Sequence, residues 1–359
     1  MKIIIDVMSG DKAPLELLKG AILAASEYNA DIAVVGDSAV IEEVALVNGL
    51  SLEGVEVVHA PDVIDMEDKP LAVIREKSQS SMSVGLRMLE RGEGDAFVSA
   101  GNTGALLAGA TLLVRRIKGI RRAAIATVLP FPKPVLLMDA GANLTVTPSD
   151  MEQFAYMGSF YLEKLHGIRA PRVGLANNGS EHTKGLPLQV ETYELLSKNP
   201  ELNFVGNIEG KEIPFSACDV LLCDGFTGNI ILKYTEGMGK FMLSTLKDLF
   251  SSSVAGKMAY LAMKPTLKGI KKQFDASEYG GAPLLGISRP VIKAHGSSDA
   301  KAVKNAVLQA IAFVSTEMNM DIAKMAADLD ARRAAAAAAA AEAKEETAET
   351  EAKTEKEEK

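Results

Sequence analysis

Residues 220–229, VLLCDGFTGN, contain the transition on which the predicted fold depends. An apolar run of the kind found in buried strands ends at Asp224. Glycine, threonine and asparagine follow, and a helical pattern then occupies residues 228–250. The same succession of short apolar run, polar loop and helix-length pattern recurs along the chain. Strands that alternate with crossover-length helices predict a three-layer αβα architecture with a mostly parallel sheet.

The remaining elements follow from the same periodicities. Strands are expected at residues 2–6, 32–35, 55–58, 95–99, 124–128, 135–139, 172–176, 220–224 and 291–294. Helices are expected at residues 15–26, 79–91, 150–166, 228–250 and 300–328. No internal repeat of roughly 20–50 residues is visible, which excludes solenoids and propellers.

Length and composition indicate a globular protein. The chain has 359 residues, of which 47% are hydrophobic and 24% charged, enough for one large α/β domain or two smaller ones. Apolar runs fall short of the roughly 20 residues that cross a bilayer, and the N-terminus has no signal-peptide pattern. We therefore expect a cytoplasmic protein. Residues 1–330 are expected to form the α/β domain, and residues 331–359 a disordered tail rich in Ala, Glu and Lys.

Charge excludes one class of partner. The net charge is −8, and residues 342–359, with eight Glu and four Lys, carry −4 of it. The rest of the chain is only mildly acidic. Because no basic field exists, no nucleic-acid partner is expected.

Polar loops follow six of the predicted strands. They are dense in Gly, Asn, Ser and Thr and lie at residues 6–11, 99–104, 139–143, 177–180, 224–229 and 294–298. In a parallel sheet the carboxyl ends of all strands meet at one edge, where ligands bind. Glycine allows close backbone approach, and hydroxyl, amide and helix N-terminal groups donate to oxyanions. The sequence therefore predicts an anion-binding edge.

Standard catalytic motifs are missing from these loops. Neither a P-loop, a three-glycine dinucleotide motif nor a Gly-x-Ser-x-Gly elbow occurs, and the four histidines lack metal-ligand spacing. Cys218 and Cys223 are expected to be inert core residues. Four aspartates could form a metal cluster but are expected to cap helices and orient loops: Asp6, Asp11, Asp139 and Asp224. We expect an enzyme that handles an oxyanion with no metal and no bound cofactor.

Six ordered motifs resemble those of one family. They are SAGNTGA at 99–105, DAGAN at 139–143, NNGSEHTKG at 177–185, DGFTGN at 224–229, SEYGGAPLLG at 277–286 and AHGSS at 294–298. The chain from Lys2 to about Val314 is similar to the bacterial phosphate acyltransferases, the acyl-acyl-carrier-protein:phosphate transacylases of phospholipid synthesis. Ser9, Val7 and His182 depart from the family pattern, and the tail has no counterpart in it.

The resemblance implies a fold like that of isocitrate and isopropylmalate dehydrogenases, and a direct attack of inorganic phosphate on the thioester of acyl carrier protein. It implies Lys184 and Asn229 as the catalytic pair, where the alternatives are a solvated loop lysine and a helix cap. Supporting contacts to substrate or phosphate are expected from Asn102, Thr103, Asn143, Asn177, Asn178, Ser180, Thr227, His295 and Ser297. For His295 a structural role stays open.

Residues 251–274 form a basic, apolar segment with five lysines and no acidic residue. Lys264-Pro265 is expected to divide it into two short helices, a hairpin that lies on an anionic membrane or binds the acidic carrier. The expected contact residues are Lys257, Met258, Leu261, Lys264, Leu267, Lys268 and Lys271. A core or dimer-interface helix with a solvated basic face is the alternative.

Partners and rival functions complete the prediction. A homodimer and a downstream membrane acyltransferase are implied by the resemblance, with peripheral membrane contact. The rivals are a phosphate acetyl- or butyryltransferase that uses acyl-coenzyme A, a metal- and nicotinamide-dependent decarboxylating dehydrogenase, and a non-catalytic membrane-surface scaffold.

Overall fold

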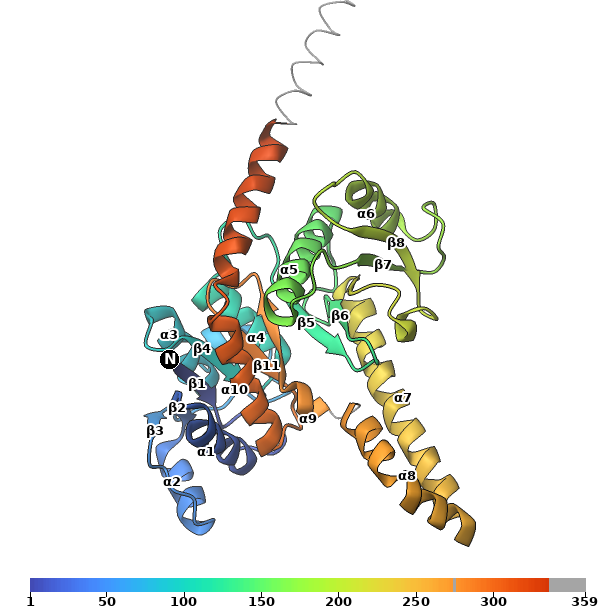
Figure 1. Cartoon of the computed structure of the whole chain (residues 1–359). Coiled ribbons are helices and arrows are strands. Elements are labelled where there is room, and N and C mark those ends of the chain that lie inside the picture. Colours follow the sequence, from blue (N-terminus) through green and yellow to red (C-terminus); the bar gives the residue numbers. More distant parts are fainter. Residues whose placement is uncertain (274–275, 336–359) are drawn as a thin grey trace, which may run out of the picture.

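The computed structural model describes residues 1–273 and 276–335, and its strands form one eleven-stranded sheet. The order across the sheet is β3-β2-β1-β4-β11-β10-β5-β6-β9-β7-β8. The strands are β1 (Lys2–Asp6), β2 (Asp31–Gly36), β3 (Val55–His59), β4 (Ala96–Ser99), β5 (Ala124–Leu129), β6 (Val135–Met138), β7 (Val173–Asn177), β8 (Phe204–Glu209), β9 (Val220–Leu222), β10 (Gly281–Leu285) and β11 (Val291–Ala294). Figure 1 shows that the strands fall into two lobes.

The sheet reverses direction at its centre. The pairs β11–β10, β10–β5 and β5–β6 are antiparallel, whereas the pairs on either side of them are parallel. Three reversals leave β6, β9, β7 and β8 running opposite to β1, β2, β3, β4 and β11. The prediction that all six polar loops lie at one edge is therefore wrong for the sheet as a whole, because each lobe has its own carboxyl edge.

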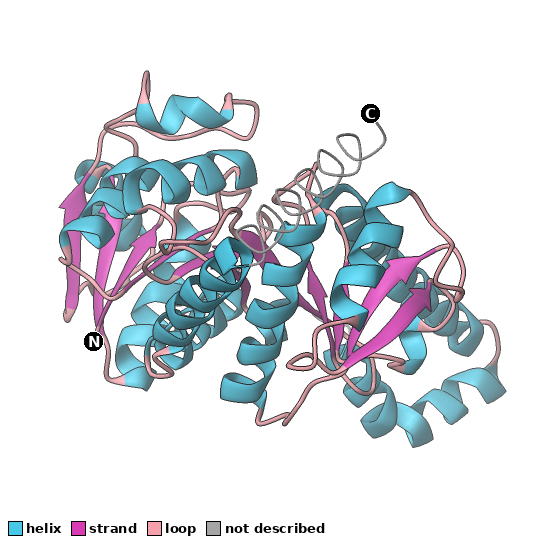
Figure 2. Ribbon diagram, turned by 90° about the horizontal axis from the view of Figure 1, so that it is seen from above, coloured by secondary structure: helices cyan, strands magenta, loops and turns pink. Residues whose placement is uncertain are grey.

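Alternating side chains show that both faces of the sheet are buried. Ile3 and Ile5 of β1 pack into one hydrophobic cluster and Ile4 into another, and all three are at most 1% exposed. In β9, Leu221 faces one cluster, whereas Val220 and Leu222 face a different one. A strand buried on both sides needs covering layers above and below. This confirms the three-layer arrangement, which Figure 2 shows with helices on both faces.

Helices make up the outer layers. The α-helices are α1 (Leu15–Tyr28), α2 (Ser38–Val47), α3 (Ser81–Arg91), α4 (Thr103–Gly109), α5 (Pro148–His166), α6 (Pro187–Ser197), α7 (Gly225–Ser251), α8 (Val254–Gln273), α9 (Ala276–Tyr279) and α10 (Ala300–Val314). Two 3-10 helices, Pro70–Ile74 and Ile213–Phe215, and a π-helical turn, Ala110–Val114, connect them. No helix within residues 1–273 and 276–335 is long and apolar enough to span a membrane.

Local sequence sets the helix ends. A capping box formed by Thr147 and Asp150 starts α5, and Gly167, with φ of 66°, ends it. The side chain of Asp224 accepts a hydrogen bond from the backbone of Thr227 at the start of α7.

The predicted hairpin differs from the observed one. Residues 254–273 form a single helix with Pro265 inside it, so the two short helices expected on either side of Lys264-Pro265 are wrong. A proline removes one intrahelical hydrogen bond, which a helix can tolerate where a neighbouring helix supports it. Helix α8 packs against α7, where the Phe250 and Tyr260 rings lie 5.9 Å apart. The α7–α8 pair projects from the body in Figure 1.

The helix predicted at 300–328 is divided. It has a turn at 315–317 and is helical again over 318–335, so the boundary predicted at residue 331 falls inside a helix. Arg332 and Arg333 tie this segment to Glu201 and Glu152 with ion pairs of 2.5 and 3.0 Å. Residues 336–359 of the predicted tail lie outside the described residues.

Candidate active site

In the second lobe, three polar loops lie side by side. β9 is hydrogen-bonded between β6 and β7, all parallel, with Leu222 opposite both Met138 and Leu175. Because the three strands end at the same level, the loops at 139–143, 177–185 and 224–229 meet at one edge. These loops carry the predicted catalytic pair and five of the supporting residues.

Asp139 organises the first of these loops. Its side chain is fully buried and accepts hydrogen bonds from the backbone of Ile125, Gly141, Ala142 and Asn143, and from the Asn143 amide, at 2.7–3.1 Å. Burial raises the pKa of Asp139, and these donors oppose that rise by stabilising the ionised carboxylate. The loop is thereby held in one shape, as expected for an orienting aspartate.

Helix α7 is packed directly onto that loop. The Gly225 amide donates to the Asn143 carbonyl at 2.7 Å, and a Cβ at Gly228 would lie only 1.9 Å from the Asp139 carbonyl oxygen. Both glycines are required by this close backbone approach. Asn229, the next residue, is exposed and lies against Gly141 of the same loop. A Cβ built on Gly141 would be 3.6 Å from the Asn229 Cβ. The first turn of α7 thus presents the Asn229 amide at the edge of the second lobe.

Several predicted contact residues use their polar groups to build the loops. The Asn143 amide donates to Ala123 and Asp139, and the Thr227 hydroxyl donates to Asp224 at 2.8 Å. The Asn177 amide donates to the Lys184 carbonyl at 3.0 Å, and its oxygen accepts from the Asn178 backbone. These hydrogen bonds leave Asn143, Asn177 and Thr227 as positioning residues.

The loop that contains Lys184 is shaped internally. Asn207 of β8 holds the Glu181 carbonyl at 2.8 Å, and Gly185, with φ of +99°, has the Asn177 side chain against it. Asn178, Ser180 and Lys184 are exposed. Within the described chain, no hydrogen bond or ion pair joins the side chains of Lys184 and Asn229, so the structure places them on adjacent loops without direct contact.

In the first lobe, the other three polar loops also converge. Asp6, Ser99 and Lys293 are opposite one another on β1, β4 and β11, and the Ser99 hydroxyl donates to Asp6 at 2.8 Å. The backbone of Asp11 donates to the Gly296 carbonyl at 2.8 Å, which joins the first loop to the last. These contacts set the carboxyl edge of the first lobe.

Asn102 and Thr103 lie in this second group of loops. Asn102 caps α4 by accepting from the Ala105 backbone, and its amide donates to the carbonyls of residues 65, 66 and 68. Asn102 therefore fixes the 65–68 segment. Thr103, the first residue of α4, is half-buried.

One side-chain contact joins the two groups of loops. Lys233, two turns into α7 in the second lobe, approaches His295 in the first lobe, with Nζ 3.4 Å from Nε2. His295 Nδ1 also contacts the Ser297 hydroxyl at 2.9 Å and backbone at 3.1 Å. Burial, together with the positive charge of Lys233, lowers the pKa of His295.

Lys233 and Lys293 were missed in the sequence prediction. Lys293 is half-buried at the end of β11, and its ammonium donates to the carbonyls of Ala100 and Ala294. Burial, together with the positive charge of Lys233, lowers the pKa of Lys293 to about 8. A lysine inside an apolar strand of a predicted parallel sheet was the available signal, since buried lysines are rare without a partner or a function.

Asp139 and Asp224, two of the four predicted metal-cluster candidates, have structural contacts. Within residues 1–273 and 276–335, no three His, Cys, Asp or Glu side chains are grouped to hold a metal ion. Asp224 caps α7 and Asp139 orients its loop, in agreement with the prediction. Both cysteines are buried, and burial raises the pKa of Cys218 to about 12 and that of Cys223 well above its usual value. Neither thiol is available as a nucleophile at neutral pH.

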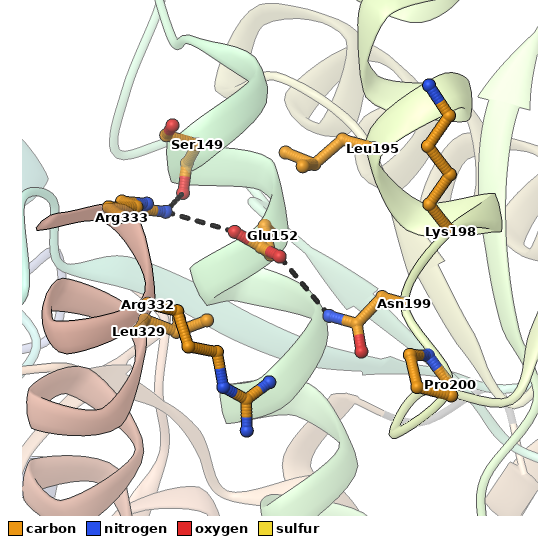
Figure 3. Close-up of a pocket in the computed structure, with 9 residues that line it drawn as sticks. All are labelled: Ser149, Glu152, Leu195, Lys198, Asn199, Pro200, Leu329, Arg332 and Arg333. Carbon is orange, nitrogen blue, oxygen red and sulfur yellow. Dashed lines mark hydrogen bonds and ion pairs between the residues drawn. The ribbon is translucent and has the colours of Figure 1, made fainter. Parts of the chain in front are cut away.

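A hollow of about 430 Å³ lies elsewhere on the second lobe and belongs to none of the six loops. It is bordered by α5, the segment after α6 and the helix at 318–335, as Figure 3 shows. Inside it, Glu152 accepts from Arg333 at 3.0 Å and from the Asn199 amide at 3.2 Å. The Glu152–Arg333 ion pair joins α5 to the helix at 318–335 inside this hollow, which indicates a structural seam.

Comparison with known proteins decides the family. The family model described as "Fatty acid synthesis protein" matches residues 1–321. A "Phosphate acyltransferase" from Alkaliphilus oremlandii is 47% identical over 319 residues, which cover 89% of this chain and 95% of that protein. The chain belongs to the phosphate acyltransferase family. The predicted family and enzyme class are thus confirmed, and the phosphate acyltransferase assignment excludes the dehydrogenase and scaffold readings.

Solved structures show how widely the phosphate acyltransferase fold is shared. A phosphotransacetylase from Streptococcus pyogenes aligns with a TM-score of 0.61 at 15% identity, covering 88% of this chain and 94% of that one. A 4-hydroxythreonine-4-phosphate dehydrogenase from Klebsiella pneumoniae aligns with a TM-score of 0.51 at 11% identity, covering 88% and 97%. Because these identities are low, the likeness concerns the fold alone.

Proposed function

We propose that this phosphate acyltransferase moves a long-chain acyl group from acyl carrier protein to inorganic phosphate and releases acyl phosphate for phospholipid synthesis. The observation that carries the proposal is the placement of Lys184 and Asn229. Both are exposed, and they stand on loops that follow adjacent parallel strands, β7 and β9. A cation and an amide donor at one edge can bind an oxygen of the attacking phosphate and the oxygen of the thioester carbonyl.

The reaction is balanced without a metal or a covalent enzyme intermediate. An oxygen of hydrogen phosphate attacks the thioester carbonyl carbon, and a tetrahedral oxyanion forms. The C–S bond then breaks with its electron pair on sulfur, and the proton lost by phosphate is taken up by the thiolate. The products are acyl phosphate and the free thiol of the carrier. Since the thioester is already activated, the protein has to position the reactants and stabilise negative charge.

The two residues have separate tasks in this proposal. The Lys184 ammonium binds a phosphate oxygen, as a flexible point charge does well. The Asn229 amide, next to the N–H groups of the first turn of α7, donates to the oxyanion. Gly225 and Gly228 serve it by allowing α7 to reach the 139–143 loop.

Single-residue variants test this assignment. We expect Asn229→Ala and Lys184→Met each to lower kcat about 10²- to 10³-fold, as removal of an oxyanion donor does. Both side chains are exposed, so the unfolding midpoint should not change. Lys198→Met removes an exposed lysine elsewhere on the same lobe and is the matched control. Full activity in both site variants would refute the assignment.

Acyl donors separate the proposal from its closest rival. Purified protein would be given palmitoyl carrier protein or palmitoyl-coenzyme A, with phosphate and no added metal, and acyl phosphate would be trapped with hydroxylamine. The proposal requires a higher kcat/KM for the carrier thioester. Preference for a short acyl-coenzyme A would instead favour the phosphate acetyl- or butyryltransferase reading.

The α7–α8 pair supports membrane or carrier contact in the proposal. Met258 and Leu261 of α8 are 68% and 67% exposed, beside the exposed lysines Lys257, Lys264 and Lys268. Leu267 is half-buried, and the side chain of Lys271 lies outside the described residues. An apolar stripe flanked by lysines suits an anionic bilayer surface. Wild-type protein should sediment with phosphatidylglycerol vesicles, whereas the double variant Met258→Glu/Leu261→Glu should stay in the supernatant. Equal sedimentation of the two proteins would exclude this contact.

A homodimer is proposed on similar grounds. The apolar residues Phe226, Ile230, Tyr234 and Phe241 recur at helical spacing on α7 and are all more than half exposed. Such a stripe on a soluble domain is typical of a covered face. Sedimentation velocity should give a dimer for wild-type protein and a monomer for Phe241→Asp, and a wild-type monomer at micromolar concentration would contradict the proposal.

A membrane acyltransferase that consumes acyl phosphate is the proposed downstream partner.

A further inference from the structure

The contact between Lys233 and His295 is the only described side-chain hydrogen-bond contact between α7 and the 294–298 loop, and its chemistry is incomplete. Lys233 Nζ lies 3.4 Å from His295 Nε2. The two residues come from different lobes, one on α7 and the other after β11. Both side chains are exposed, so a ligand can reach them.

The proton of the imidazole can be assigned from its other contact. The Ser297 backbone N–H donates to His295 Nδ1 at 3.1 Å, so Nδ1 carries a lone pair. A neutral imidazole with a lone pair on Nδ1 bears its proton on Nε2. The lowered pKa of His295 agrees with the neutral form. Nε2–H and the Lys233 ammonium are then both donors, and two donors 3.4 Å apart lack an acceptor between them.

Lys293 adds a second ammonium behind this gap. It occupies the register position opposite Ser99. Its ammonium donates two hydrogen bonds, to the Ala100 and Ala294 carbonyls, and has one N–H left to donate. Lys233 is near enough to lower its pKa. A half-buried ammonium facing another cation is costly unless an anion also lies nearby.

Carboxylates near the gap do not fill it. Glu236 binds Lys233 at 2.9 Å, on the same face of α7. Asp6 is buried and accepts from Ser99 and from the Met8 backbone. Asp11 is exposed beside Gly296. Lys240, two turns of α7 beyond Lys233, adds positive charge near His295. The charges are therefore partly balanced, and what is missing is an acceptor oxygen between Nζ and Nε2.

We infer that Lys233, His295 and Lys293 form an anion site that binds a phosphoryl group across the gap between the lobes. Separate oxygens of the phosphoryl group would accept hydrogen bonds from His295 Nε2–H and from the Lys233 ammonium. The remaining N–H of Lys293 would donate a third hydrogen bond. This site is additional to Lys184 and Asn229. Its assignment to a phosphoryl group rests on the proposed function.

Two substrates could supply that group. One is inorganic phosphate itself, and the other is the phosphodiester in the pantetheine arm of the carrier. In both cases the ligand presents anionic oxygens with tetrahedral spacing, so the same three donors would recognise either.

Binding measurements on the full chain test the inference without a thioester. Calorimetric titrations would use inorganic phosphate and, separately, 4′-phosphopantetheine. We expect Lys233→Gln and His295→Ala to weaken at least one of the two probes about 10- to 100-fold, the effect of losing a hydrogen bond to a charged group. His295→Gln keeps an N–H donor and should lose less. Lys247→Gln removes an exposed lysine from the same helix and should bind as wild type does.

The outcomes are separable. Weakened phosphate binding assigns the site to inorganic phosphate, and weakened 4′-phosphopantetheine binding assigns it to the carrier arm. If Lys233→Gln, His295→Ala and Lys293→Met bind both probes as tightly as Lys247→Gln, or if wild-type protein binds neither, the inference is overturned. Because Lys293 is half-buried, circular dichroism would first show whether Lys293→Met is folded. Lys233 and His295 are exposed, so their variants are expected to fold as wild type does. If the site binds phosphate but the protein forms no acyl phosphate from a carrier thioester, the proposed function fails and the anion site stands.

Discussion

Replacing Gly228 by alanine should disturb both the fold and the active site. A Cβ at this position would lie 1.9 Å from the Asp139 carbonyl oxygen, 2.9 Å from its carbonyl carbon and 3.0 Å from Cys223 Sγ. A real Cβ needs about 3 Å or more, so α7 must move away from the 139–143 loop by about 1 Å. The contacted oxygen is backbone, and the loop is held by the buried Asp139, so a side-chain rotation cannot relieve the clash.

The magnitude follows from those contacts. Overpacking against a rigid wall costs about 1–3 kcal/mol, and we expect the upper end here because the obstacle is a carbonyl. Asn229 is the next residue, so a shift of about 1 Å at its base should lower kcat about 10²-fold. Urea unfolding followed by circular dichroism measures the first effect, and acyl phosphate formation at saturating phosphate measures the second.

The same helix contains the control. A Cβ at Gly237 would meet nothing within 4 Å, so Gly237→Ala should raise the free energy of unfolding by about 0.5–1 kcal/mol through helix propensity. Ordinary surface substitutions change the free energy of unfolding by less than about 0.5 kcal/mol. A change no larger than that for Gly228→Ala would refute the close-approach argument.

Three further outcomes can be measured. Burial and Lys233 set the folded pKa of Lys293 at about 8, below the value of about 10.4 in an unfolded chain, so the unfolded state binds more protons between those pH values. The unfolding free energy of wild type should therefore rise relative to Lys293→Met from pH 8 to 10.4, by at most about 3 kcal/mol, and parallel curves would contradict this. The titratable groups around this lysine are Lys233, Asp6, Asp11 and His295. Cys218 and Cys223 should react with a thiol reagent at pH 8 only after unfolding, and rapid labelling of native protein would show that burial is misjudged. Arg333→Met should destabilise the chain by about 1–3 kcal/mol because Glu152, 6% exposed, loses its cation, and Lys324→Met on the same helix is the control.

The periodic parts of the fold were predictable from the sequence. Strands β1 and β11 have the predicted bounds, and the other seven predicted strands each differ from the observed ones by one or two terminal residues. Apolar β-branched runs flanked by polar loops leave few alternatives. Strands β8 and β10 were missed. Strand β10 contains Gly281 and Pro283, residues that argue against a central strand. The structure shows why proline is tolerated: Pro283 pairs only with β11, and β5 begins to pair at Leu284.

The reversal of the sheet depends on the antiparallel β5–β6 pair. The two reversals at β10 cancel each other, so β5 runs parallel to β11, and β6 is the first strand of the second lobe to run the other way. Both β5 and β6 were predicted, but in the sequence analysis their pairing was not. Residue type alone therefore placed six loops at one edge where the molecule has two.

The candidate site shows a second limit of sequence reasoning. Asn102, Asn143 and Thr227 are the residue types that bind anions, but their donors are directed to backbone carbonyls or to Asp224. Whether an amide faces a ligand or its own loop depends on packing, which the composition of a loop does not contain. Lys233 and Lys293 were missed because they lie on a helix and a strand, outside the loops where ligand residues were sought.

The order of the strands also affects how the protein is made on the ribosome. The first lobe is assembled from β1 to β4 together with β11, and α10 packs against α1, with the Ala300 backbone donating to Glu16. Residues 291–314 leave the ribosome only after the entire second lobe. Until then, the nascent N-terminal segment carries an uncovered face on α1 and an unpaired edge on β4. The first lobe therefore cannot close before residues 291–314 have been synthesised, and this is the interval in which a chaperone would have to shield it.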